Sequence, residues 1–194
     1  MANEIKQYFD SLAPSWDAMD CIRDERISAL LRRVDIKVGD SVLDLACGTG
    51  RISGLLHNMS QADILGVDIA PKMISIAKEK YSGKDWASFE VSDFLSMTTE
   101  KPFDVIVIYN AYPHFLKRGE LQEALCRNLK AHGKFAIVHS LSREQLSEHH
   151  NHLDPKITRA LLPVEEEAAF YEDCFSTVIA EEGDDFYLIV GQKR

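Results

Sequence analysis

One short stretch combines an acid with two glycines at a spacing that could bind a cationic, nucleotide-like ligand. Residues 42–45 place Asp44 among apolar residues, and Gly48 and Gly50 follow before a helix-compatible run that begins at Arg51. Glycines let the backbone turn sharply and approach a ligand closely, and the free N–H groups of a helix opening point into the same space. A carboxylate beneath such a loop repels a pyrophosphate and attracts a sulfonium or ammonium group. We therefore predict a buried strand, a binding loop and a helix.

The pattern Asp44-x-x-x-Gly48-x-Gly50 resembles the first motif of the class I S-adenosylmethionine-dependent methyltransferases. It departs from the dinucleotide-binding fingerprint, which has a third glycine where this chain has Ser53. The resemblance implies S-adenosyl-L-methionine as cofactor and a seven-stranded sheet over residues 38–194. Residues 8–17 resemble the N-terminal lid of small-molecule methyltransferases, especially the branch that includes quinone-biosynthesis enzymes.

Two further acids fall at expected strand ends. Asp68 ends a second buried strand, where an acid can accept both ribose hydroxyls, although a surface acid before a helix is the alternative. The resemblance implies that Asp93 accepts from the adenine amino group and that the Phe94 N–H meets a ring nitrogen; a turn-forming Asp is the alternative. The full set expected at the cofactor is Asp44, Ala46, Gly48, Gly50, Asp68, Ile69, Met73, Asp93, Phe94 and Asn110, with Tyr8 and Trp16 from the lid unless these aromatics only pack it.

Histidines gather where a methyl acceptor would bind, beyond the carboxyl ends of strands four and five. Histidine is suited to take a proton from a hydroxyl, thiol or acidic carbon, because its unperturbed pKa is about 6.5. We name His114, His139 and Tyr112 as catalytic candidates; for each histidine alone, a hydrogen-bonded structural role is the alternative. His139 with His149 and His152 could bind a divalent metal, but no Cys or Asp spacing supports this, and we expect none.

Alternating strand and helix patterns surround these residues. Two amphipathic helices are expected over 4–34, broken near Pro14, and strands over 42–45, 62–68, 89–94, 103–108 and 134–140. Helices are expected over 51–59, after Ala70 and over 117–130, the last ended by a turn at 130–133. A capping box at Ser142 and Gln145 predicts a short helix, Asp154 and Pro163 could open two more, and 175–182 with 186–190 predict a hairpin. This indicates an α/β, doubly wound, mostly parallel sheet with an antiparallel edge strand, in one domain over 1–194 with a helical lid over 1–36.

The composition of the chain limits the kinds of partner that we expect. The chain has 194 residues, 45% of them hydrophobic, a net charge of −9 and four scattered cysteines. The acidic balance argues against nucleic-acid binding, and residues 110–113 (Asn-Ala-Tyr-Pro) are not the Asn/Asp-Pro-Pro-aromatic motif of enzymes that methylate planar amino groups. Scattered cysteines and the lack of a leader or of a long apolar run predict a cytoplasmic protein with reduced thiols and no membrane span, as a monomer or homodimer.

These patterns together favour a methyltransferase that uses S-adenosyl-L-methionine on a small-molecule acceptor, with the acceptor atom (O, S, N or C) left open. One alternative is a protein that binds the same cofactor without transferring its methyl group. A less favoured alternative is a nicotinamide-dependent oxidoreductase, which the missing third glycine and Asp44 argue against.

Overall fold

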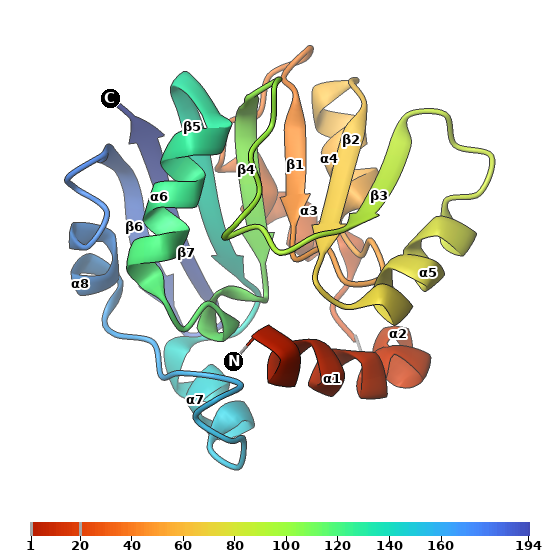
Figure 1. The fold of residues 1–194 in the computed structure, drawn as a ribbon. Coiled ribbons are helices and arrows are strands. Elements are labelled where there is room, and N and C mark those ends of the chain that lie inside the picture. Colours follow the sequence, from red (N-terminus) through yellow and green to blue (C-terminus); the bar gives the residue numbers. More distant parts are fainter. Residues whose placement is uncertain (1, 20) are drawn as a thin grey trace.

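The computed structural model describes residues 2–19 and 21–194 and contains one seven-stranded sheet (Figure 1). The strand order is β3-β2-β1-β4-β5-β7-β6, in which β7 alone runs antiparallel to its neighbours β5 and β6. The strands are β1 (Val42–Leu45), β2 (Ile64–Asp68), β3 (Ala87–Val91), β4 (Phe103–Tyr109), β5 (Leu129–His139), β6 (Phe175–Gly183) and β7 (Phe186–Lys193). The doubly wound, mostly parallel sheet closed by a terminal hairpin is confirmed.

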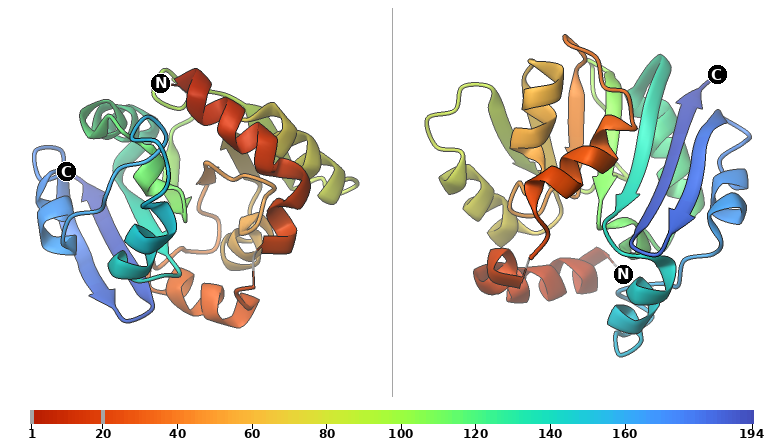
Figure 2. Two further views of the ribbon diagram at one scale, coloured as in Figure 1. Left: turned by 90° about the horizontal axis from the view of Figure 1, so that it is seen from below. Right: turned by 180° about the vertical axis from the view of Figure 1, so that it is seen from behind.

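Helices cover both faces of this sheet. They are α1 (Ala2–Leu12), α2 (Trp16–Met19), α3 (Asp24–Arg32), α4 (Ser53–Ser60), α5 (Pro71–Lys80), α6 (Arg118–Asn128), α7 (Arg143–His150) and α8 (Val164–Ala169), with short 3₁₀ turns η1 (Ala13–Ser15) and η2 (Tyr112–His114). One core cluster packs α3 and α4 against the sheet, and a second packs α6 and α8 against the opposite face. Figure 2 shows α3 crossing the back of the sheet. No helix among the described residues is long and apolar enough to cross a membrane.

The first helices divide into two groups with different roles. Ile27, Leu30 and Leu31 of α3 are buried in the sheet core, whereas α1 and α2 contain no buried residue. Figures 1 and 2 show α1 lying across the carboxyl ends of the strands, with α7 beside it. The part that covers the cavity described below is therefore α1, η1 and α2, while α3 belongs to the packed body.

Three predicted segments differ from the structure. The third strand covers Ala87–Val91 and not 89–94, because the Asp93 carboxylate accepts from Leu95 N and the chain turns there. The helix α6 ends at Asn128, and residues 129–133 already belong to β5, because the buried Asn128 amide bonds Ala124 O and Met97 O while Leu129 pairs with Phe103. No helix begins at Asp154: only one turn forms there, and the chain then runs without helix or strand to 163. The capping box of α7 and the terminal hairpin are confirmed.

Candidate functional site

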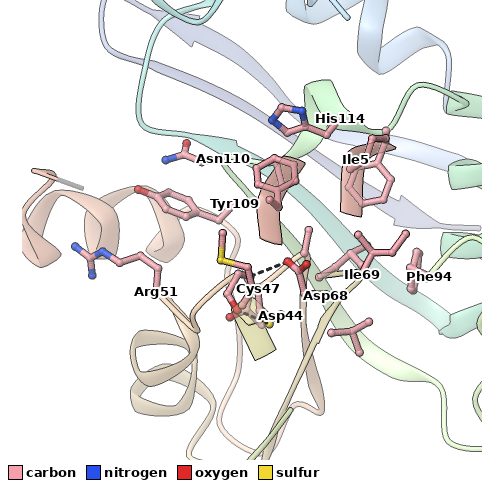
Figure 3. Close-up of a pocket in the computed structure, with 18 of the residues that line it drawn as sticks. Ile5, Asp44, Cys47, Arg51, Asp68, Ile69, Phe94, Tyr109, Asn110 and His114 are labelled. Atoms are coloured by element: carbon pink, nitrogen blue, oxygen red, sulfur yellow. Dashed lines mark hydrogen bonds between the residues drawn. The ribbon is translucent and has the colours of Figure 1, made fainter. Parts of the chain in front are cut away.

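A cavity of about 750 Å³ opens at the carboxyl ends of β1, β2 and β4, beneath α1 and α2. This volume falls in the range of roughly 300–1,000 Å³ that is usual for small-molecule and cofactor sites. Most of its wall is apolar, and Figure 3 shows the side chains of Asp44 and Asp68 lying near one another in it. Ligands of open α/β sheets bind at this edge of the sheet.

The loop between β1 and α4 forms the floor of the cavity. Ala46, Gly48 and Gly50 all have positive φ, at 56°, 53° and 78°. A Cβ at Gly50 would lie 2.8 Å from the Tyr81 ring, whose hydroxyl also donates to Gly50 O at 2.8 Å. Gly50 is thus the point where the loop is held from outside; it does not line the cavity, whereas Ala46 and Gly48 do. A positive φ at an alanine costs energy, and such strain concentrates at binding sites.

Two carboxylates lie buried beneath this loop. Asp44 is 1% exposed and accepts a hydrogen bond from Ser53 Oγ at 2.6 Å. Burial, opposed by the Ser53 bond and reinforced by the neighbouring Asp68 charge, raises the pKa of Asp44 to about 7. Asp68 accepts from Gly48 N at 2.9 Å and from Ala70 N at 2.8 Å, and burial raises its pKa as well. Both line the cavity, so this end attracts positive charge.

The remaining cofactor candidates of the sheet also line the cavity, with Ile69, Met73, Asp93, Phe94 and Asn110 among them. Asp93 Oδ1 accepts from Leu95 N at 3.1 Å, so it forms a turn there. The amide of Asn110 is engaged with Ser140: Oδ1 accepts from Ser140 N at 3.0 Å, and Nδ2 donates to Ser140 Oγ at 2.9 Å. Asn110 therefore joins the ends of β4 and β5 at the cavity wall.

The lid contributes Trp16, as expected, but Phe9 in place of Tyr8. Phe9 lines the cavity and packs edge-on against His114, with ring centroids 4.8 Å apart, whereas Tyr8 is not part of the lining. Ile5 lies one helical turn before Phe9 and also lines it. Neither residue was among the expected site residues, although their four-residue spacing on an amphipathic helix was the available signal.

Charged groups fasten the lid to the body. Asp10 accepts from Lys72 N at 2.8 Å, at the start of α5, where Ala70 offers no side-chain cap. Asp17 pairs with Lys80 at 2.7 Å and accepts from Thr49 Oγ1 in the glycine loop. The position of α1 and α2 over the cavity is thus held by side-chain bonds to both ends of α5 and to the glycine loop.

The far end of the cavity is apolar and contains histidines. His114, His149 and His150 line it together with residues of α1 and α7. The Nδ1 of His114 lies 2.9 Å from Ile157 O, and burial lowers the pKa of this ring to about 4, with a smaller lowering from His150. Since a carbonyl only accepts, Nδ1 carries the hydrogen and Nε2 carries the free lone pair.

Two of the three catalytic candidates lie outside the cavity lining. Tyr112 is fully buried and donates its hydroxyl hydrogen to Glu167 at 2.7 Å. His139 is also fully buried, against the Tyr187 ring, and neither of its ring nitrogens has a hydrogen-bond partner in the described structure. Side chains alternate along a strand, and His139 falls on the same face as the buried Phe135 and Ile137; it is not part of the cavity lining. Of the three, His114 alone reaches the cavity wall.

A metal site formed by His139, His149 and His152 is not present. His149 and His152 are exposed while His139 is fully buried, and the described residues hold no group of three His, Cys, Asp or Glu side chains placed to bind a metal.

The basic side chains of the lining are already engaged. Arg51 donates to Asp24 and to Ile22 O, each at 2.6 Å, and Lys117 pairs with Glu120 at 2.6 Å. A dinucleotide would place its pyrophosphate near the glycine loop, where Asp44 and Asp68 lie instead. The two carboxylates near the glycine loop therefore suit a cationic ligand and not an anionic one.

Known proteins share this organisation. A family described as "Methyltransferase domain" matches residues 36–191. Trans-aconitate 2-methyltransferase of Methylobacterium nodulans is 31% identical over 63% of this chain and 48% of its own length. Ubiquinone/menaquinone biosynthesis C-methyltransferase of Geotalea uraniireducens is 27% identical over 70% of this chain and 62% of its own length. A solved complex of DhpI with SAH has a TM-score of 0.76 at 18% identity, covering 99% of this chain and 96% of that one.

The chain spans about half the length of the first curated relatives that it matches, at 44–48% of each. The family match nevertheless covers the sheet except for the last two residues of β7, together with the loop that forms the cavity floor. The expected resemblance is confirmed at this level, and the chain belongs to the methyltransferase-domain family.

Proposed function

We propose that this protein is an S-adenosyl-L-methionine-dependent methyltransferase that acts on a small-molecule acceptor. The observation that carries the proposal is the pair of buried carboxylates, Asp44 and Asp68, beneath a glycine loop in a lidded cavity. The cofactor is a cation at its sulfonium and ammonium groups, so this end of the cavity matches its charge.

The residues present fit this cofactor. Gly48 leaves space beside Trp16 and Met73, since a Cβ there would lie 3.5 Å from Trp16 Nε1 and 4.0 Å from Met73 Sδ. Each Asp68 oxygen accepts one backbone hydrogen and retains a second lone pair for a ribose hydroxyl. Asp93 and Phe94 line the wall next to Asp68 and would hold the adenine. When bound, S-adenosyl-L-methionine supplies an activated methyl group.

The protein's own task is then to align the acceptor and to manage its proton. Positioning two reactants in a closed site can lower a barrier by several kcal/mol without a covalent intermediate. Phe9 and Trp16 cover the cavity and exclude water, and His114 Nε2 can accept the proton of a protic acceptor. The low pKa of His114 keeps this nitrogen unprotonated at neutral pH.

The lining favours an uncharged acceptor. In the part of the lining that the structure describes, Arg51 and Lys117 are the Arg and Lys side chains, and both already pair with acids. A carboxylate or phosphate on the acceptor would thus have no free cation to meet, while Phe115, Leu141 and Leu146 offer apolar surface. We infer a neutral, largely apolar acceptor with a hydroxyl, thiol or acidic carbon.

Calorimetric titration with S-adenosyl-L-methionine, S-adenosylhomocysteine and NADH tests the cofactor. Binding of the first two and not of NADH is expected, and binding of NADH alone would overturn the proposal. Turnover is then measured with tritiated cofactor against matched neutral and carboxylated phenols and thiols. A protein that binds S-adenosyl-L-methionine but transfers to no acceptor would match the alternative of a binding protein.

A further inference from the structure

The ring of His114 is held by a segment that has no helix or strand of its own. Residues 157–159, here called the strap, contact η2 on both sides of this histidine. Ile157 O accepts from His114 Nδ1 at 2.9 Å, while the Arg159 backbone N–H donates to Pro113 O at 3.0 Å. Arg159 Nε also donates to Phe115 O at 3.4 Å. The strap therefore determines which carbonyl the imidazole faces.

The position of the strap sets the tautomer of the ring. With Ile157 O in place, a hydrogen on Nδ1 forms a hydrogen bond to this oxygen. A hydrogen on Nε2 would instead leave the Nδ1 lone pair facing a lone pair of Ile157 O. Without that carbonyl, the two neutral tautomers compete freely. A base that takes a proton on Nε2 needs the Nδ1–H form, so displacement of the strap would reduce the competent population.

A buried carboxylate outside the cavity holds the strap. Glu167 of α8 is 0% exposed, and its oxygens accept from Arg159 Nη1 at 2.5 Å and Nη2 at 3.3 Å. The Arg159 guanidinium also lies over the Tyr112 ring, 4.6 Å from its centroid. Glu167 accepts further bonds from Tyr112 Oη at 2.7 Å and Arg118 Nη1 at 3.2 Å. Glu167 Oε1 also accepts from the Leu162 backbone N–H at 3.2 Å, so the side-chain bonds of Glu167 end on η2, the strap, α6 and the chain just before α8.

The bonds of Glu167 do more than fill the core, because they orient the side chains at both ends of η2. Tyr112 and His114 are the first and last residues of η2. Glu167 holds Tyr112 through the Tyr112 hydroxyl and holds His114 through Arg159 and the strap. A buried ion pair is seldom a net source of stability, and apolar residues of equal volume often serve better. Its presence here is explained by a geometric task.

We propose that Glu167 is a positioning residue, which acts through Arg159 and the strap to hold His114 with hydrogen on Nδ1 and a lone pair on Nε2. The inference builds on the proposed function for what His114 acts on, but the orientation itself is a property of the protein alone. It also assigns a role to Tyr112, which supports the same carboxylate from the buried side.

The experiment reads the tautomer directly. Long-range ¹H–¹⁵N correlation spectra of ¹⁵N-histidine-labelled protein distinguish a protonated from an unprotonated nitrogen in each ring, and the His114 signals are assigned by their loss in H114Q. Glu167→Gln removes the charge with little change in volume. Glu166→Gln, on the same helix but exposed, is the matched control. Arg159→Lys keeps the charge but lacks the Nε–H that bonds Phe115 O, and serves if E167Q does not fold.

The wild type and E166Q should show the Nδ1–H form of His114, and E167Q or R159K should show loss of that form to a mixture with Nε2–H. Affinity for S-adenosyl-L-methionine should be unchanged in these variants. An unchanged His114 signature in both E167Q and R159K would overturn the positioning role, even if both variants melted at lower temperature. Failure of the wild type to bind the cofactor would overturn the proposed function and leave the tautomer result standing.

Discussion

Affinity for the proposed cofactor should depend on pH through Asp44. Burial and the nearby Asp68 charge raise the pKa of Asp44 to about 7, so about half of the free protein carries this carboxyl in its neutral form at pH 7. A cationic ligand binds the ionised form, and binding must first remove the proton from the rest. The ionised fraction is about one half at pH 7 and about one tenth at pH 6. The dissociation constant of S-adenosyl-L-methionine should therefore rise about fivefold from pH 7 to pH 6.

The assay is calorimetric titration at four or five pH values between 6 and 7. Over this range the ligand's α-amino group stays largely protonated, since its ordinary pKa is about 7.7–8.0. His114 and His139 do not contribute, because burial lowers their pKa values to about 4 and about 3. S-adenosylhomocysteine keeps the amino group but lacks the sulfonium charge. An equal pH dependence for both ligands would place the amino group at Asp44, and a dependence for the methionine ligand alone would place the sulfonium there.

Asp44→Asn is the matched control. It removes the titrating group with almost no change in shape, although Ser53 then faces an amide. Binding should weaken by roughly 1.5–3 kcal/mol, which is typical of a lost bond to a charged group, and should become independent of pH between 6 and 7. Asp68→Asn tests whether the neighbouring acid shares the effect. A flat profile in the wild type, or the same slope in D44N, would refute the assignment of Asp44 as the cation-binding group.

Three further variants test other parts of the structure. Gly50→Ala should destabilise the fold by about 1–3 kcal/mol in urea unfolding, because a Cβ at a φ of 78° would meet the Tyr81 ring at 2.8 Å, whereas Gly119→Ala, with open space around it, should be neutral or stabilising. Asp10→Ala removes the lid's bond to the first turn of α5, worth about 1 kcal/mol, and should speed amide exchange in residues 2–19. Unchanged exchange would contradict the role of Asp10 in holding α1 on the body. His139 has a folded pKa of about 3 against about 6.5 when unfolded, so its contribution to stability is present above pH 6.5 and is lost as pH falls, by about 2 kcal/mol between pH 7 and pH 5; His139→Leu should remove this share of the pH dependence and leave the share of His114.

The centre of the sheet was predictable because β1 and β4 are buried on both faces. Residues 42–45 and 103–108 read as buried strands, the glycine loop marks the carboxyl end of the first, and Asp68 marks the carboxyl end of β2. Local pattern was sufficient there, since covered parallel strands need little more than burial. The same local signals identified the capping box of α7 and the hairpin turn at 183–185.

The side chains that face the cavity could not be predicted from local sequence pattern, because tertiary packing decides which of them do so. Whether Tyr8 or Phe9 faces the cavity is decided by the rotation of α1 about its axis, and Phe9 packs against Ala70 and Met73 of the body. His114 reaches the cavity wall from η2, where Ile157 O bonds its ring, whereas His139 is buried in the core; both outcomes depend on residues of distant elements. The strap escaped prediction altogether, because it is held by bonds to Pro113 and Phe115, which are far away in sequence, and by a buried side chain, Glu167, on the helix that follows it.

The two ends of the cavity should therefore contribute to different kinetic quantities. Asp44 attracts positive charge, which the bound cofactor carries before methyl transfer and loses from sulfur during it. An interaction that weakens toward the transition state aids binding and not the rate. The rate must then come from alignment of cofactor and acceptor in the closed cavity, and from a base. The base takes up the proton of the acceptor, which would otherwise become positively charged as it receives the methyl group. Loss of the Asp44 charge should raise the dissociation constant without lowering saturated turnover, and loss of the His114 imidazole should lower saturated turnover with little effect on the dissociation constant.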